Sequence, residues 1–401
     1  MAKSFISGAK GEKPRSDLRV KYTPSKKPLS ISVNSTVDTF FGKAIKQQTK
    51  SICKDLHIGT GTIEIEDFGA LPFVIAARLE AAIKQAHPDL QLESLQPMKD
   101  FGIYASSRDR FRRSRLYLPG NQSKLMLNAG IHKPDGIILD LEDSVSPSEK
   151  EDTRYVVRNA LRALDFLGAE RMVRINQGEL GLKDLEFIVP HNVHLILIPK
   201  VESVEEIKII DERILEISKI CGRKEPVFLM PIIESGRGIL KTLDIAESSL
   251  NIVALAIGLE DYTADLGVPR TEEGKESFFA RSMIVNAARA AGVQAIDTVY
   301  SDVDNEVGLR ESIKEAKSIG FDGKGCIHPR QIKPMHEEFA PSVEQIEKAK
   351  KVTLAFDEAE KKGLGVVSLG SKMIDPPVVK RALHTIKLAI ASNLLNPDWK
   401  N

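Results

Sequence analysis

Short apolar runs that alternate with amphipathic helical segments fill the middle of the chain. The runs are apolar on both faces, which is typical of strands buried in a parallel sheet. Eight strands are predicted, at 115–118, 136–141, 171–175, 194–199, 227–233, 252–259, 294–298 and 324–328. Helices are predicted to follow them, for example at 149–165, 204–218, 238–248, 276–291 and 305–319. Eight repeats over roughly 215 residues favour an α/β fold of the (β/α)8 TIM-barrel type over an open doubly wound sheet.

A smaller α+β unit precedes the barrel. Residues 1 to about 20 are polar and rich in Lys, Gly and Ser, and they predict a flexible arm. Alternating residues predict strands at 29–33 and 62–66, and apolar positions at helical spacing predict helices at 37–56 and 71–86. The result is a compact βαβα unit, too small to enclose a deep active site.

The predicted parts of the chain are an α+β unit at 1–97, a linker at 98–112, the barrel at 113–340 and a C-terminal helical extension, or lid, at 341–401. The linker lacks periodicity and ends in a cluster of arginines, which is typical of a solvated surface and less often of a phosphate contact. The extension consists of an amphipathic stretch, a glycine-rich loop and a final helix.

Composition narrows the choice of partner. Hydrophobic residues make up 42% of the chain, charged residues 28%, and the net charge is +1. No strong field is present for nucleic acid or a membrane surface, so a small molecule is the expected partner. Three cysteines lie far apart, which argues against a disulfide framework or a zinc site and suits the cytoplasm. We expect neither a signal peptide nor a membrane span.

The predicted strands end in charged residues. The carboxyl ends of the strands carry the active site of a TIM barrel. The residues at these positions are Asp140, Glu142, Asp143, Arg174, Asn176, Lys200, Glu234, Glu260, Asp261, Asp297, Asp302 and His328. Glu234 and Asp261 end neighbouring strands, and two carboxylates suit Mg²⁺, which completes its shell with water and substrate oxygens. The alternative is a buried acid pair bridged by Arg174 or Lys200.

Two arginines are candidates for holding an anionic substrate. Arg113 and Arg174 offer planar forks for a carboxylate or a thioester oxygen, with Glu142 and Asp143 beside them as further binding candidates. The alternative is that both arginines form structural ion pairs with these two acids. No Walker loop and no Ser-His-Asp or Cys-His arrangement is evident, so a metal with arginines favours chemistry on an oxyanion.

Nine motifs follow one another between residues 113 and 390. They are RSRLYLPGN (113–121), LDLEDSV (139–145), VRIN (173–176), LIPK (197–200), IESGRG (233–238), IGLEDY (257–262), FDGK (321–324), IHPRQI (327–332) and KMIDPP (372–377). Together they resemble the citrate lyase beta subunit, the citryl thioester lyase of the HpcH/HpaI aldolase superfamily. The resemblance implies retro-Claisen cleavage of a citryl thioester to oxaloacetate and an acetyl thioester. Lyases that act on free malyl-CoA or citramalyl-CoA, and a non-catalytic carrier or assembly subunit, stay as alternatives.

The N-terminal unit has motifs of its own. They are VNS (33–35), FFGKAI (40–45), EDFGAL (66–71) and ARLEA (77–81), and they are similar to the citrate lyase gamma subunit, an acyl carrier protein. That family carries a covalent phosphoribosyl-dephospho-CoA arm on a serine two residues before an Asp. Here Arg15 stands two residues before Asp17, and the nearest serine is Ser16. Either Ser16 carries the arm with a shift of one residue, or the carrier is not modified.

The resemblance also implies roles for individual residues. Glu234 and Asp261 would bind Mg²⁺, while Arg113 and Arg174 would hold the substrate, a CoA-type thioester. Arg113 would also act in catalysis, by stabilising the enolate oxygen of the departing thioester. Asp375 on the lid would be the catalytic acid and would serve a neighbouring subunit's site. We therefore expect a homo-oligomer, a trimer or a hexamer, and a citrate lyase alpha-like transferase as a partner.

Overall fold

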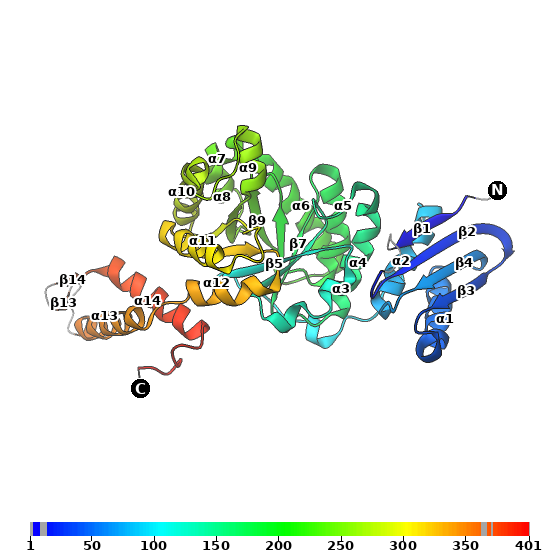
Figure 1. Ribbon diagram of the computed structural model, residues 1–401, viewed down its shortest axis with the longest axis horizontal. Helices are drawn as coiled ribbons and strands as arrows, with labels where there is room; N and C mark the ends of the chain where they lie inside the picture. The colour runs from blue at the N-terminus through cyan, green and yellow to red at the C-terminus, as the bar shows by residue number, and fades with distance from the viewer. Residues whose placement is uncertain (1–2, 9–13, 362–366, 370–371, 401) are drawn as a thin grey trace.

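A computed structural model describes residues 3–8, 14–361, 367–369 and 372–400. Three parts follow one another across Figure 1: the N-terminal unit, a barrel in the centre and a pair of C-terminal helices on the other side. Among the described residues, no helix is long and apolar enough to cross a membrane.

Eight parallel strands close into the barrel in chain order, and the prediction of a (β/α)8 barrel is confirmed. The strands are β5 (Ser114–Pro119), β6 (Gly136–Asp140), β7 (Glu170–Arg174), β8 (Leu195–Ile198), β9 (Phe228–Ile233), β10 (Ala254–Ile257), β11 (Gln294–Asp297) and β12 (Gly323–Cys326). Pairing of Lys324 in β12 with Ser114 in β5 closes the ring. Each observed strand lies on one of the eight predicted runs, because strands buried on both faces leave an uninterrupted apolar signal.

Helices surround the barrel. They are α3 (Ser123–Met126), α4 (Lys150–Ala163), α5 (Gly178–Ile188), α6 (Val204–Cys221), α7 (Gly236–Leu240), α8 (Thr242–Glu247), α9 (Leu259–Leu266), α10 (Lys275–Ala291), α11 (Glu306–Ile319) and α12 (Ile332–Phe339). Short 3-10 turns occupy Asp100–Gly102, Ala129–His132, Pro147–Glu149, Val189–His191 and Pro329–Gln331. Local sequence sets some boundaries: the Ser203 hydroxyl accepts the Glu206 N–H and binds its carboxylate in a capping box, and α6 ends at Gly222 with φ of 70°.

The N-terminal unit is a four-stranded sheet with two helices. Its strands run in the order β1 (Phe5–Gly8), β2 (Leu18–Pro28), β4 (Thr60–Asp67) and β3 (Ser30–Ser35), and its helices are α1 (Asp38–Asp55) and α2 (Pro72–Ala86). The expectation of a flexible arm up to residue 20 is wrong for the described residues, because β1 pairs with β2. Strand β2 buries Leu18 and Val20, while its charged residues form cross-strand ion pairs, for example Lys21 with Glu64 at 2.7 Å. Because of these charged residues, β2 was not predicted from the sequence.

The N-terminal unit is docked on the barrel through α2 and α4. Helix α2 is buried from Phe73 to Ile83, because one side packs on its own sheet and the other on α4. At the contact, Arg158 of α4 and Glu80 of α2 form an ion pair of 2.7 Å, and both side chains are 0% exposed. The Asn159 amide donates to the carbonyl of Phe73 at 3.1 Å. The unit is therefore held in one place by buried polar contacts.

The linker before the barrel is also tied down. The Arg112 side chain is 0% exposed and pairs with Glu170 at the start of β7, at 2.7 Å, so this part of the arginine cluster is not a solvated surface. Tyr104 donates to the carbonyl of Ala169 at 2.6 Å. The linker thus packs on the amino-terminal side of the barrel.

The C-terminal extension forms a separate packed pair of helices, α13 (Val343–Lys361) and α14 (Pro376–Ala391), joined by the hairpin of β13 (Val367–Leu369) and β14 (Lys372–Ile374). Val352, Val379 and Ile386 belong to their shared core. In Figure 1 the pair projects from the side of the barrel, with the hairpin at its far tip. No described residue of the extension lines the hollow at the mouth of its own barrel.

We predict that Arg158→Met destabilises the chain by about 3 kcal/mol, because it leaves the buried Glu80 carboxylate with only Lys84, at 3.2 Å, and the Ser94 N–H, at 3.4 Å, as partners. Urea unfolding gives the free energy of unfolding. The matched control is Arg213→Met, which breaks exposed ion pairs with Glu186 and Glu216 and should cost less than about 1 kcal/mol. Equal effects of the two substitutions would contradict a buried interface.

Candidate active site

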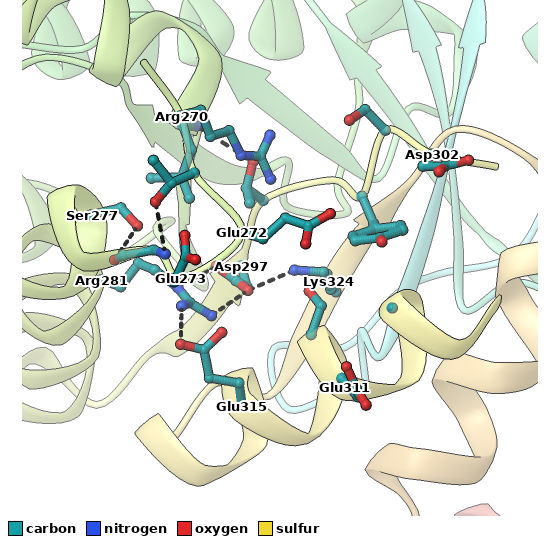
Figure 2. Close-up of a pocket in the computed structure, with 18 of the residues that line it drawn as sticks. Arg270, Glu272, Glu273, Ser277, Arg281, Asp297, Asp302, Glu311, Glu315 and Lys324 are labelled. Atoms are coloured by element: carbon teal, nitrogen blue, oxygen red, sulfur yellow. Dashed lines mark hydrogen bonds and ion pairs between the residues drawn. The ribbon is translucent and has the colours of Figure 1, made fainter. Parts of the chain in front are cut away.

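Two hollows lie at the carboxyl ends of the barrel strands. The larger, about 740 Å³, lies between the segments that follow β10 and β11 and the first turns of α10 and α11 (Figure 2). Its described lining includes eight acidic side chains and three basic ones. At its inner wall, Asp297 accepts from Lys324 at 2.7 Å and from Arg281 at 3.0 Å. With its basic groups engaged in this way, the hollow is unsuited to an anion.

The second hollow, about 380 Å³, is the mouth of the barrel itself. Tips of strands on opposite sides of the ring line it, and they bring together Glu234, Asp261, Asp140, Asp143 and Arg174. These residues were predicted from their position at the strand ends, and five different strand–helix units supply the charged groups of this region. This hollow is the candidate active site.

Glu234 and Asp261 meet because β9 and β10 are neighbours. Ile233 pairs with Ile257 in register, so Glu234 directly follows β9 and Asp261 lies in the first turn of α9, after β10. Gly258 makes this approach possible, since a Cβ at that position would lie 2.8 Å from the Glu234 carboxyl. Ser235 caps α7 by accepting the Gly238 N–H at 3.1 Å, which fixes the turn after β9.

The two carboxyls are electrostatically coupled. Burial, followed by the hydrogen bond and the charge of Asp261, raises the pKa of Glu234 to about 8. Burial works against ionisation of Asp261 as well, but the hydrogen bond from Glu234 and the charge of Lys200 lower the pKa of Asp261 below its usual value. Near neutral pH the pair therefore holds one proton, as expected for like charges in contact.

A divalent cation fits this pair. Two carboxyls in contact favour a positive partner, and carboxylate oxygens are what Mg²⁺ prefers. Among the residues that the structure describes, no group of three or more His, Cys, Asp or Glu side chains is placed to hold a metal. Two protein ligands with water and substrate completing the shell is an ordinary arrangement for Mg²⁺.

Arg174, the last residue of β7, is fixed by three carboxylates. Its Nε and Nη2 donate to the two oxygens of Asp140, each at 2.7 Å, and its Nη1 lies 3.0 Å from Glu142 and 3.7 Å from Asp143. Burial would lower the pKa of Arg174, but the bidentate bond with Asp140 raises it. The ion pairs considered from the sequence are present, and they hold the guanidinium at the mouth of the barrel.

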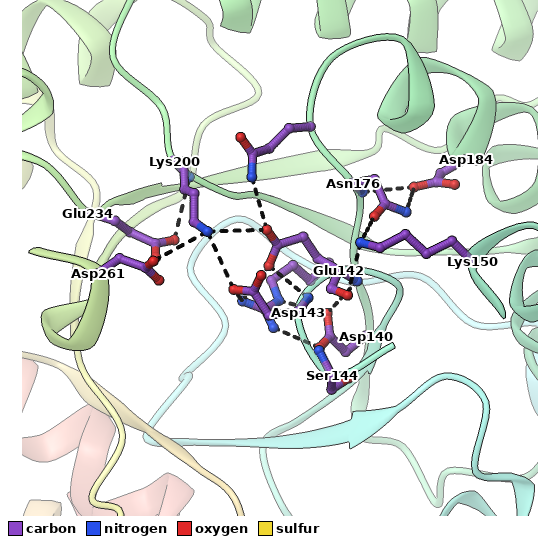
Figure 3. A network of polar contacts seen from close by, with 12 residues as sticks. Asp140, Glu142, Asp143, Ser144, Lys150, Asn176, Asp184, Lys200, Glu234 and Asp261 are labelled. Atoms are coloured by element: carbon purple, nitrogen blue, oxygen red, sulfur yellow. Dashed lines mark hydrogen bonds and ion pairs between the residues drawn. The ribbon is translucent and has the colours of Figure 1, made fainter. Parts of the chain in front are cut away.

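Lys200 stands in the centre of the acids in Figure 3. Its ammonium is 3.3 Å from Asp261, 3.6 Å from Asp143 and 3.7 Å from Glu142. Burial lowers the pKa of Lys200, but these carboxylates together raise it. The sequence marked Lys200 as a charged residue at a strand end and as a possible bridge for an acid pair, and the structure shows a cation that links Asp261 to Glu142 and Asp143.

Arg113 is the one substrate-binding candidate that the structure moves elsewhere. It precedes β5 and so lies at the amino-terminal end of the barrel, opposite the mouth. Its guanidinium is bidentate to Asp135, at 2.9 Å for both bonds, and also donates to Ser392 after α14. This corrects the expectation that Arg113 faces the substrate, because the whole length of β5 separates it from the strand tips.

Two further candidates lie outside the mouth. Asp375 caps α14 by accepting the Val378 N–H at 3.1 Å, and the described lining of the barrel mouth includes no residue of the C-terminal extension. Ser16 is half-buried, with φ of 56°, and its carbonyl accepts from the Ser123 hydroxyl at 2.7 Å. Since Ser123 follows β5, Ser16 lies against the same face of the barrel as the acids.

Two residues of the mouth were missed in the sequence. Tyr117 and Arg115 both point into the barrel from β5, since alternate residues of a strand share a face. The ring of Tyr117 lies 5.4 Å from the guanidinium of Arg174. The signal available in the sequence was the alternation of residues along β5, which places Arg115 on the same face as Tyr117. Using it required knowing which face of β5 points into the barrel.

Comparisons with known proteins agree with this architecture. Residues 113–329 match the family described as HpcH/HpaI aldolase/citrate lyase, and residues 10–86 match the carrier family described as malonate decarboxylase delta subunit (MdcD). The citrate lyase subunit beta of Haemophilus influenzae is 43% identical over 283 residues, which are 70% of this chain and 97% of that protein. The mitochondrial citramalyl-CoA lyase of Homo sapiens is 34% identical over 302 residues, 72% of this chain and 89% of that protein.

Solved structures show the same likeness. CitE from Mycobacterium tuberculosis, in complex with magnesium, acetoacetate and coenzyme A, matches with a TM-score of 0.57 and 28% identity over 71% of this chain and 99% of that one. The fold and the site thus define a TIM-barrel enzyme with an acid pair placed for a divalent cation. The chain belongs to the HpcH/HpaI aldolase/citrate lyase family and is a lyase, with a carrier-like unit fused ahead of its barrel.

We predict that Mg²⁺ binding displaces the proton of Glu234. Below its pKa of about 8, Glu234 is protonated in the metal-free protein, so apparent Mg²⁺ affinity should rise as pH rises and level off above that value. One displaced proton corresponds to about a tenfold gain per pH unit between about pH 6 and pH 8. Calorimetry in buffers of different ionisation enthalpy measures both quantities.

The control is Glu260→Gln. Glu260 adjoins Asp261 but is ion-paired with Arg270, so this substitution should leave the pH slope unchanged. Affinity that is flat across the same pH range would argue against the shared proton.

Proposed function

We propose that the chain cleaves a citryl thioester into oxaloacetate and an acetyl thioester by Mg²⁺-assisted retro-Claisen chemistry. The observation that carries this proposal is the placement of the Glu234 and Asp261 carboxyls together at the barrel mouth, beside the fixed guanidinium of Arg174. The likeness to the Haemophilus influenzae citrate lyase subunit beta supports it. Citramalyl-CoA cleavage, the activity named for the human relative, is the second candidate.

The reaction breaks one carbon–carbon bond. The tertiary hydroxyl loses its proton and becomes the ketone of oxaloacetate, while the bonding electrons pass to the departing thioester as an enolate, which gains a proton at carbon. Mg²⁺ held by Glu234 and Asp261 would supply Lewis-acid stabilisation of the oxygen charge. Arg174 would bind and orient the substrate beside these two carboxyls, in a position fixed by Asp140.

Three further charged residues would surround the substrate: Glu142, Asp143 and Lys200. We assign Glu142 and Asp143 to substrate binding, with Lys200 holding their side chains beside Asp261. Burial, followed by its contact with Asp143, raises the pKa of Glu142. The network is thus poised to hold a proton near the reacting oxygen.

We further propose that Asp375 donates the proton at the acetyl carbon, in the active site of a neighbouring subunit. Its helix pair projects away from its own barrel mouth, which supports a lid shared within a homo-oligomer, a trimer or a hexamer. Asp375 caps α14, so its carboxylate is held at the tip of a rigid element.

A mixing experiment tests both assignments. Glu234→Gln and Asp375→Asn should each lower Mg²⁺-dependent cleavage at least about 100-fold, because one removes a metal ligand and the other the proton donor. After the two variants are mixed, dissociated and reassembled, activity should return in sites that pair an intact barrel with an intact lid. Glu260→Gln is the control that should stay active. Two inactive variants that never complement would contradict the shared lid.

The carrier unit is proposed to present the substrate as a covalent thioester. A phosphoribosyl-dephospho-CoA arm on Ser16 would begin at the face of the barrel that holds the acids, a position supported by the Ser16–Ser123 contact. A citrate lyase alpha-like transferase would load the arm. Cytoplasmic location is part of this proposal, and free thiols at Cys53, Cys221 and Cys326 support it.

We predict that the natively produced chain carries the mass of this arm and that the mass is lost in Ser16→Ala. Ser123→Ala is a control, since it removes the contact but not the attachment oxygen. An unmodified native chain would instead favour free CoA thioesters, in keeping with Arg15 at the position two residues before Asp17. Intact-mass spectrometry of protein from its own host distinguishes these outcomes.

A further inference from the structure

Arg115 lies inside the barrel, below the acids of the active site. Its side chain is 2% exposed and lines the same hollow as Glu234, Asp261 and Arg174. It extends from β5 toward Met230 of β9, and its Nη1 contacts the Met230 sulfur at 2.9 Å. The guanidinium is therefore part of the floor of the hollow.

This guanidinium has no anionic partner among the described residues. Its Nε is buried without a hydrogen bond, and the Met230 sulfur is a weak acceptor. Other buried arginines of the chain are paired at 2.6 to 3.0 Å with carboxylates: Arg78 with Asp17, Arg112 with Glu170, Arg154 with Asp184, Arg158 with Glu80 and Arg281 with Asp297. Arg171 is also buried without a carboxylate, but it donates to two backbone carbonyls, at 3.2 and 3.5 Å. Arg115 has only the Met230 sulfur, and an unpaired buried charge is costly, so Arg115 calls for a partner that arrives from outside.

The hollow gives such a partner access. Arg174, the other arginine in its described lining, is already engaged by Asp140 and Glu142. Next to Arg115 the wall consists of Gly325, where even a Cβ would lie 3.6 Å from Nη2 of Arg115. Gly325 thus places no side chain of its own against the guanidinium, which has no counter-ion among the described residues.

We propose that Arg115 binds the outer carboxylate of the acyl group and so selects citryl over citramalyl thioesters. This inference rests on the proposed function. The hydroxyl and its adjacent carboxylate are common to both acyl groups and belong with Glu234, Asp261 and Arg174. Citryl carries one more carboxylate, on a CH2 group, where citramalyl has a methyl group. A buried fork of N–H donors suits that carboxylate and gains nothing from a methyl group.

The test compares Arg115→Met with wild type on citryl and citramalyl thioesters, with Mg²⁺ present. Wild type should prefer citryl. In Arg115→Met, kcat/KM for citryl should fall about 100-fold, because a site built to bond a polar group discriminates strongly, while kcat/KM for citramalyl should change by less than about threefold. The preference for citryl would thus fall by roughly the same factor of 100.

Arg171→Met is the matched control. Arg171 is likewise buried, with its Nη2 unpaired, but it lies at the amino-terminal side of β7, against the rings of Tyr104 and Phe166 and outside the hollow. Its replacement should lower the melting temperature without changing the ratio of the two kcat/KM values. If Arg115→Met acted only through the loss of a buried arginine, Arg171→Met would change the ratio of the two kcat/KM values equally. That outcome would overturn the proposal.

A second measurement needs no variant. Oxaloacetate and pyruvate, the ketone products from citryl and citramalyl, differ by the same carboxylate. Calorimetry on wild type with Mg²⁺ should show oxaloacetate binding at least about tenfold more tightly. Equal binding, or an unchanged citryl preference in Arg115→Met, would overturn the role of Arg115 alone. A wild-type protein that cleaves neither thioester would instead overturn the proposed function.

Discussion

The contact between the Glu234 and Asp261 carboxyls is the interaction on which the functional end of the barrel depends. Burial and like charge keep a proton between them, with the pKa of Glu234 near 8, so the pair is stable only with a proton or a cation present. Neighbouring residues make room for the two carboxyls and balance their charge. Gly258 provides the room, while Arg174 and Lys200 balance the negative charge at the mouth. A cation site and an oxyanion site therefore lie side by side in one hollow.

The fused carrier-like unit adds a constraint of another kind. A carrier on a flexible tether can occupy a large volume. Here α2 packs on α4, and the segment at Ser16 lies against the loop after β5. Such docking raises the effective concentration of anything attached there, without new contacts to the acyl group. It also opposes release, because separating the surfaces would expose apolar residues of α2 that are buried against α4. The geometry favours service to the barrel of the same chain over exchange with distant partners.

The chain as a sequence predicted the barrel and seven of the residues that the mouth and its network bring together: Asp140, Glu142, Asp143, Arg174, Lys200, Glu234 and Asp261. Strands that are buried on both faces stay apolar throughout, so each β-strand of the barrel was visible as a local run. The acids at the strand tips were visible because the residue that follows a parallel strand always lies on the same edge. Strand β2 was missed, since its outward side chains are charged and only Leu18, Val20 and Tyr22 face the core. Local composition therefore gave a wrong prediction for β2, a strand with one face exposed to solvent.

Sequence by itself thus determined the order of the strands, the acids at their tips and the family, because each of these is recorded in contiguous residues. Only the tertiary structure decided which arginine of β5 faces the mouth. Arg113 and Arg115 are two residues apart, yet one pairs with Asp135 at the base and the other enters the barrel. The tertiary structure also decided the position of Lys200 between Asp261, Asp143 and Glu142, and the direction in which the lid projects. These features depend on where a strand begins in the ring and on contacts between distant segments, which no local pattern encodes.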